Sequence, residues 1–232
     1  MRLLIMGPPG AGKGTQATLI KKAYNIPHIS TGEMFREAIE NNTPLGAKAK
    51  AFMEEGLLVT DDITNGIVKD RLLQNDCNKG FLLDGYPRTI VQAEFLRETL
   101  NEMNTELDSV INLEISKNVL VDRIVGRRVC TNCGATYHIK TKPAKVEGIC
   151  DVCGSKLVQR DDDTETTFVR RLDVYIKNTE PLLEYYREKG ILININGTGE
   201  IDTIQKDIKT TLGGLNDNIK KWSRNTINEG SW

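Results

Sequence analysis

The residues best suited to chemistry lie near the N-terminus, in the stretch 7–16, which reads GPPGAGKGTQ. It follows a short apolar run, Arg2–Met6, which is typical of a strand, and leads into a helical pattern over Thr15–Lys22. Glycines at such a junction let backbone N–H groups turn toward an anion, and the start of the helix adds unpaired donors and partial positive charge. Lys13 adds a full charge. The stretch therefore predicts a phosphate-binding loop. A glycine-rich turn without a ligand is the alternative, but it would give the lysine no purpose.

This loop departs from the usual P-loop pattern at one position. The pattern has Ser or Thr after the lysine, whereas this chain has Gly14 followed by Thr15. Because the missing hydroxyl normally binds Mg²⁺, we expect the nucleotide phosphates and waters to hold the metal with less help from the loop. Asp84 ends the apolar run Phe81–Leu83 and is placed to orient Mg²⁺ through its waters. Its alternative role is to cap the next turn, but the glycine and proline that follow already supply turn chemistry.

Four of the five cysteines form two CxxC pairs, Cys130 with Cys133 and Cys150 with Cys153. A glycine follows each pair, and the spacing between the pairs is in the range of zinc sites. The alternative is two disulfides. Structural zinc contributes about 10–16 kcal/mol to folding a small motif, against about 3 kcal/mol for a bridge of this loop size, and a reducing compartment also favours zinc. We expect the zinc to be structural, because four thiolates leave no open position for water. Cys77 stands alone and is expected to be a structural thiol.

Arginines are the second feature that suggests anion binding. Arg123 and Arg127 are four residues apart on an expected helix over 118–128, where they would repel each other unless an anion lay between them. Other arginines lie near the expected strand ends, and together they suggest a site for more phosphate than one triphosphate carries. These are Arg36, Arg88, Arg160 and Arg171.

Length and charge set the broad class. The chain has 232 residues, 39% of them hydrophobic, enough to bury one core with insertions. A net charge of −1 argues against bulk attraction to nucleic acid or to an anionic membrane, so we expect neither as a partner. No segment has the length of a membrane span, and the N-terminus lacks the features of a signal peptide. We therefore expect a cytoplasmic protein.

Five short apolar runs alternate with helical patterns, which predicts a parallel sheet covered by helices. The runs are Arg2–Met6, Ile26–Ile29, Gly80–Asp84, Ser109–Glu114 and Ile191–Ile195. Between the second and third runs, a long helical region with a capping box from Ser30 to Glu33 indicates an inserted subdomain. The cysteine-rich stretch Val129–Gln159 indicates a second insertion.

The remaining segments carry structural expectations only. A long helix is expected from about Asp161 to Lys189, with acidic residues in its first turns and a kink or break at Pro181. His28 and His138 lack ligand spacing and are expected to be structural or solvated. The stretch 216–232 suggests a loose tail of unknown role.

Taken together, these motifs resemble those of the bacterial adenylate kinases whose lid carries zinc. The matching stretches are GPPGAGKGTQ, HISTGEMFR, FLLDGYPRT with Gln92 following, VDRIVGRR, the CxxC pairs, and QRDDD followed by RRL, in the order of the family over residues 1–213. The resemblance implies the α/β P-loop nucleoside-monophosphate kinase fold, with a five-stranded parallel sheet flanked by helices. It divides the chain into a CORE domain (1–29, 60–125 and 164–215), an AMP-binding insertion (30–59) and a zinc-containing lid (126–163).

The resemblance also implies a role for each matching position. ATP would contact Gly10, Ala11, Gly12, Lys13, Gly14, Thr15, Arg123, Arg127, Thr136, Tyr137 and Gly199. AMP would contact Thr31, Arg36, Leu57, Leu58, Val59, Gly85, Tyr86, Pro87, Arg88, Gln92, Arg160 and Arg171. Catalysis would depend on Lys13, Asp84, Arg88, Arg123, Arg160 and Arg171, and zinc on Cys130, Cys133, Cys150 and Cys153.

The implied activity is a reversible, Mg²⁺-dependent transfer of the γ-phosphoryl group of ATP to AMP, by a monomer whose lid closes over the substrates. Gln92 offers a donor and an acceptor to an adenine edge, and with Thr31 it favours adenine. One alternative is a kinase for GMP, CMP or UMP. Another is a zinc-knuckle protein that binds nucleic acid, but the knuckle region has one tyrosine and few lysines, a poor platform for stacking and charge.

Overall fold

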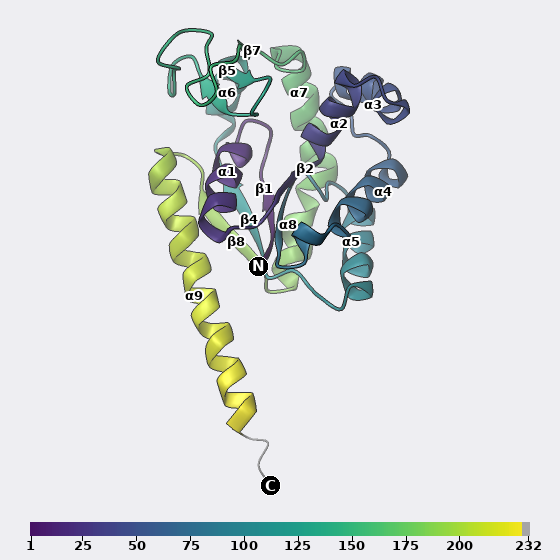
Figure 1. Cartoon of the computed structure of the whole chain (residues 1–232), viewed down its shortest axis with the longest axis vertical. Coiled ribbons are helices and arrows are strands. Elements are labelled where there is room, and N and C mark those ends of the chain that lie inside the picture. Colours follow the sequence, from purple (N-terminus) through teal and green to yellow (C-terminus); the bar gives the residue numbers. More distant parts are fainter. Residues whose placement is uncertain (229–232) are drawn as a thin grey trace.

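A five-stranded parallel sheet forms the centre of the molecule. The computed structural model describes the backbone of residues 1–228 and the side chains of residues 1–214. The strands run in the spatial order β2-β3-β1-β4-β8, and all four pairings are parallel (Figure 1). Their bounds are β1 Arg2–Met6, β2 His28–Ser30, β3 Phe81–Asp84, β4 Ser109–Glu114 and β8 Leu192–Asn196. The five apolar runs therefore form one sheet, as predicted.

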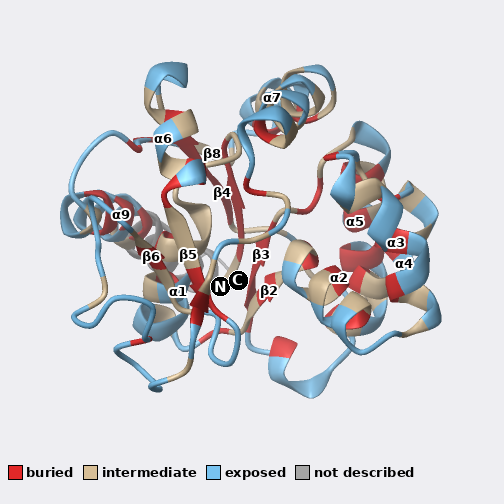
Figure 2. Ribbon diagram, turned by 90° about the horizontal axis from the view of Figure 1, so that it is seen from above, coloured by how far each residue is buried: buried red, intermediate tan, exposed pale blue. Residues whose placement is uncertain are grey.

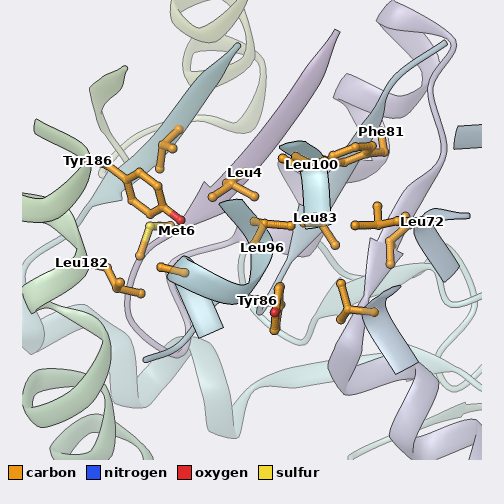
Figure 3. Packing of buried hydrophobic residues seen from close by; sticks show 14 of the residues in the cluster. Leu4, Met6, Leu72, Phe81, Leu83, Tyr86, Leu96, Leu100, Leu182 and Tyr186 are labelled. Carbon is orange, nitrogen blue, oxygen red and sulfur yellow. The ribbon is translucent and has the colours of Figure 1, made fainter. Parts of the chain in front are cut away.

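Helices cover both faces of this sheet, because its strands are apolar on both sides. One face packs against α4 (Asp61–Leu72), α5 (Ile90–Glu102) and α8 (Pro181–Glu188) in a cluster that includes Leu4, Met6 and Leu83 (Figure 3). The other packs Leu3 and Ile5 against α1 (Lys13–Tyr24) and α9 (Ile201–Asn228). In Figure 2 the strands are largely buried, and the helices around them are partly buried and partly exposed. The packing on both faces positions the ends of β1, β2 and β3.

The first insertion consists of α2 (Thr31–Glu40) and α3 (Pro44–Glu54), on one side of the sheet's upper end (Figure 1). The Ser30 side chain accepts a hydrogen bond from the Glu33 N–H at 3.4 Å, as half of the predicted capping box. The two helices pack closely, since a Cβ built on Gly46 would meet the Ala38 carbonyl oxygen at 2.1 Å. A short 3₁₀ turn, Asn75–Cys77, precedes β3 and buries Cys77, as expected of a structural thiol.

The second insertion contains a small antiparallel sheet of order β6-β5-β7, on the opposite side of the same end (Figure 1). Its strands are β5 Arg127–Cys130, β6 Thr136–His138 and β7 Leu157–Val158. The prediction of one helix over 118–128 is wrong. A 3₁₀ turn (Lys117–Val119) and the short helix α6 (Leu120–Val125) end before Gly126, because the backbone from Arg127 onward pairs with β6. Arg123 and Arg127 therefore do not share a helix face.

The long helix after this insertion also differs from the prediction. It begins as α7 (Glu165–Val174), with Thr164 as N-cap, so Asp161 to Asp163 precede the helix and do not lie in its first turns. A π-helical turn, Tyr175–Thr179, then leads into α8, whose first residue is Pro181. The expected break at Pro181 is confirmed. Proline fits a helix start because its missing N–H has no partner to lose there.

The C-terminal segment corrects the expectation of a loose tail. α9 continues as a helix to Asn228 and projects away from the rest of the molecule (Figure 1), whereas residues 229–232 lie outside the described part. In the sequence, Leu215, Ile219 and Trp222 keep the three- and four-residue spacing of a helix. Among the described residues, no helix has both the length and the hydropathy needed to span a membrane.

Candidate active site

A cavity of about 780 Å³ opens at the carboxyl ends of the central strands, where the two insertions meet the core. In parallel sheets, ligands bind at this edge because the loops and helix N-termini converge there. The cavity collects most of the predicted nucleotide-contacting residues: Gly10, Ala11, Gly12, Lys13, Gly14, Thr15, Thr31, Arg36, Leu57, Leu58, Val59, Asp84, Gly85, Arg88, Gln92, Arg123, Arg127, Thr136, Tyr137, Arg160, Arg171 and Gly199.

The loop between β1 and α1 is the base of this cavity. Gly10 and Gly12 have φ values of 86° and 91°, a conformation that L side chains rarely adopt. Lys13 Nζ donates to the carbonyl oxygens of Gly7 at 2.7 Å and Pro8 at 2.9 Å. Burial lowers the pKa of Lys13 to about 8, with Asp84 raising it and nearby arginines lowering it further. A bound phosphate would raise the pKa of Lys13 again, since its negative charge stabilises the ammonium group.

Asp84 faces the loop from the end of β3. Burial alone would raise the pKa of this carboxyl, but a hydrogen bond from His28 and the charges of Lys13 and Arg88 outweigh burial and lower it. His28 Nε2 lies 3.3 Å from Asp84 Oδ2. A Cβ built on Gly14 would lie 3.8 Å from the same oxygen, so the absence of a side chain there leaves the space in front of the carboxylate open. Asp84 therefore fits a metal held through waters.

Four arginines from separate segments also line the cavity: Arg36 on α2, Arg88 after β3, Arg160 after β7 and Arg171 on α7. Burial and mutual repulsion lower the pKa of Arg88 to about 10 and that of Arg160 to about 9. Arg88 is oriented by Nε, which donates to the Gly85 carbonyl oxygen at 2.8 Å. Such a cluster of guanidinium groups matches a phosphate or carboxylate anion.

Two aspartates neutralise part of this cluster. Arg171 Nη1 contacts Asp162 Oδ2 at 2.9 Å and Asp163 Oδ1 at 3.5 Å. Asp163 is fully buried and also accepts hydrogen bonds from the guanidinium of Arg127. A buried carboxylate is stable only when paired in this way. Asp162 and Asp163 therefore bind arginines and do not lie in the first turn of α7.

Gln92, at the start of α5, lies at the wall of the cavity beside the first insertion. Its Oε1 accepts from the Arg88 N–H at 2.7 Å, and its Nε2 donates to Asp61 Oδ1 at 2.7 Å. Thr31 Oγ1 donates to the Gly85 carbonyl oxygen at 2.8 Å. Direct hydrogen bonds thus join the loop after β3, the start of α5 and the first insertion around this part of the cavity.

Hydrogen bonds join the second insertion to the core and fix the helix that leads into it. Thr136 Oγ1 on β6 lies 3.2 Å from Thr15 Oγ1, at the end of the phosphate loop. Arg123 on α6 donates to the Gly197 carbonyl oxygen at 3.2 Å, close to Gly199. The second insertion therefore covers the cavity from the side of the loop.

The four cysteines Cys130, Cys133, Cys150 and Cys153 converge, with all four Sγ atoms within 4.8 Å of one another. The Cys130–Cys153 and Cys133–Cys150 Sγ distances are 3.4 and 3.6 Å. A tetrahedral ion with S ligands at about 2.3 Å would place them about 3.8 Å apart. The cluster can therefore hold a metal ion. The Tyr137 hydroxyl lies 3.5 Å from Cys150 Sγ and accepts from the Asp151 N–H at 2.8 Å, so this side chain points toward the cluster.

Three features of the site differ from what the sequence indicated. Tyr86 and Pro87 line a smaller neighbouring pocket, and the Tyr86 side chain is buried, its hydroxyl 2.7 Å from Asn65 Oδ1. His28 and His138 both line the main cavity, although the sequence indicated no ligand role for either. The sequence also gave no indication of Asp61, whose contact with Gln92 joins residues 31 positions apart.

These features define a P-loop α/β protein with two insertions over a phosphate-binding cavity, the arrangement of a nucleotide phosphotransferase. A family model described as adenylate kinase matches residues 5–191. The chain is 57% identical to the adenylate kinase of Caldanaerobacter subterraneus subsp. tengcongensis over 214 residues, covering 92% of this chain and 97% of the relative. It is 54% identical to that of Geobacillus sp. (strain WCH70) over 215 residues, covering 93% and 100%. The chain belongs to the adenylate kinase family.

Proposed function

We propose that the protein catalyses the reversible transfer of the γ-phosphoryl group of ATP to AMP, giving two ADP, with Mg²⁺ as cofactor. The observation that carries this proposal is the cavity itself. It is lined by the phosphate loop and by a cluster of four arginines, and its volume is about 780 Å³. One triphosphate does not require cationic groups from both insertions and the core.

The residues act by positioning and by charge. The loop and Lys13 hold the phosphates of ATP, and the arginines hold the monophosphate and stabilise charge as the phosphoryl group passes between two oxygens in line. An arginine at such a transition state contributes about 10³–10⁵-fold in rate. No covalent intermediate is involved, so no nucleophilic side chain is required. Asp84 would hold Mg²⁺ through waters, and the ion would neutralise charge on the transferring phosphates.

The two insertions have different roles in this proposal. The first, with Thr31, Arg36 and residues 57–59, binds AMP beside Gln92. The second, with Arg127 and Thr136 and beside Arg123 of the core, closes over ATP and excludes the water that would otherwise hydrolyse it. Zinc in the four-cysteine cluster would stabilise this lid without taking part in chemistry, because its coordination sphere is complete.

A coupled ADP-formation assay with ATP and each of AMP, GMP, CMP and UMP tests the proposal. We expect AMP to be the preferred acceptor, and a clear preference for another base would contradict the assignment to AMP. Lys13→Met should abolish transfer while circular dichroism stays unchanged. Activity retained in that variant would contradict the role of the loop.

Three expectations from the sequence remain predictions: a monomer, a cytoplasmic location and no nucleic-acid partner. Size-exclusion chromatography with light scattering tests the first. Salt-dependent binding of oligonucleotides at micromolar protein would contradict the third.

A further inference from the structure

The side-chain amide of Gln92 is held in a single orientation. Its Nε2 donates to Asp61 Oδ1 at 2.7 Å and its Oε1 accepts from the Arg88 backbone N–H at 2.7 Å. A carboxylate only accepts hydrogen bonds and a backbone N–H only donates, so these partners fix which end of the amide is oxygen and which is nitrogen. Rotating the amide by 180° would put two acceptors together at one end and two donors at the other.

Asp61 is itself fixed. Thr89 Oγ1 donates to Asp61 Oδ1 at 3.1 Å and also accepts from the Gln92 N–H at 3.1 Å, which ties both residues to the start of α5. Gln92 is 2% exposed and lines the main cavity. Asp61 does not line it. Any effect of Asp61 on a ligand therefore passes through Gln92.

The held amide has one N–H and one oxygen lone pair left for a ligand. An adenine edge offers an amine donor at N6 and an acceptor at N1, which fits a glutamine amide as acceptor and donor. A hypoxanthine edge has the reverse order, with an acceptor at O6 and a donor at N1. It would fit only the rotated amide, which Asp61 and the Arg88 N–H oppose.

We propose that Asp61 is a positioning residue that sets the base specificity of the acceptor site, by holding Gln92 in the orientation that accepts adenine and rejects a 6-oxopurine. The proposal rests on the proposed function, because it takes the cavity wall at Gln92 as the place where the acceptor base lies. It assigns Asp61 no contact with either substrate.

AMP and IMP are the matched probes, since they differ only at the base edge. The measurement is the ratio of kcat/KM for AMP to that for IMP, with ATP and Mg²⁺ saturating. This ratio does not depend on the fraction of correctly folded enzyme. In Asp61→Asn we expect the ratio to fall about tenfold, because the new amide can face either end of Gln92 while the Arg88 N–H still opposes rotation. The KM for ATP should stay unchanged.

Three further variants complete the experiment. Asp62→Asn removes the same charge from the exposed neighbouring position of α4 and should keep the ratio within twofold. Asp61→Ala should lower the ratio as Asp61→Asn does. In a Gln92→Ala background, Asp61→Asn should change the ratio no further, because the residue through which it acts is gone.

Two results would overturn the inference while leaving the proposed function intact: an unchanged ratio in both Asp61 variants, or the same change in the Gln92→Ala background. If the wild-type protein transferred phosphate to neither nucleotide, the proposed function would fail and this inference with it.

Discussion

The ammonium group of Lys13 provides a direct test of the phosphate loop, because its pKa is lowered from 10.5 to about 8. Burial is the largest cause, and the charge of Asp84 offsets part of it. With this pKa, about nine-tenths of Lys13 is charged at pH 7 and about one-tenth at pH 9. Because kcat/KM reports the free enzyme, kcat/KM for ATP should fall about tenfold between these two values.

The same profile measured as kcat should fall less over this range. The phosphates of bound ATP favour the charged ammonium and raise its pKa in the complex. The assay is direct quantification of ADP by chromatography, which avoids the pH dependence of coupling enzymes. A kcat/KM that stays flat to pH 9.5 would refute the assigned pKa and the role derived from it.

The free energy of unfolding should rise with pH over the range in which activity falls. Folding lowers the pKa of Lys13, so between pH 8 and 10.5 the unfolded chain binds more protons than the folded chain and the free energy of unfolding rises with pH. The upper limit of this contribution is about 3 kcal/mol, and partial exposure to solvent reduces it. Urea unfolding of the wild type and of Lys13→Met at pH 8 and pH 10 isolates it. A difference between the two proteins that does not change with pH would contradict the prediction.

The remaining predictions concern the two insertions. Removing the metal with a chelator, or replacing Cys130 and Cys133 with Ser, should make the lid unfold at a lower temperature than the core. A melting curve that does not change on metal removal would count against a structural metal in the four-cysteine cluster. Tyr137→Phe should weaken metal binding about tenfold in competition with a chromophoric chelator, and equal affinity would show that its hydroxyl has no such role. Gly46→Ala should destabilise the protein by about 2–3 kcal/mol because its Cβ would meet backbone atoms, whereas the control Gly66→Ala, with open space, should stabilise it by about 0.5–1 kcal/mol.

Features that depend on residues close together in the sequence were predictable. The loop around Lys13 and the two CxxC pairs depend on residues a few positions apart, and the structure brings the four cysteines together as their spacing indicates. The strands were predictable because buried parallel strands are continuously apolar. Even Pro181 signalled a break, since proline cannot extend a helix from within.

Features that depend on distant partners were not. Helical spacing put Arg127 beside Arg123, but pairing with β6 takes the backbone out of the helix at Gly126. His28 meets Asp84, 56 residues away, only because β2 and β3 are neighbours in the sheet. Asp61 lies at the start of α4, where an acidic residue commonly complements the helix dipole. Its position in the sequence therefore did not indicate its contact with Gln92.

The contacts of Arg171 and Arg127 with Asp162 and Asp163 have a consequence for how a ligand binds. If a phosphate binds one of these guanidinium groups it replaces a carboxylate, and binding is then an exchange of anions. The number of paired charges changes little, and the affinity reflects the difference between two strong interactions. Such an exchange would release Asp162 and Asp163 from these arginines when a phosphate binds.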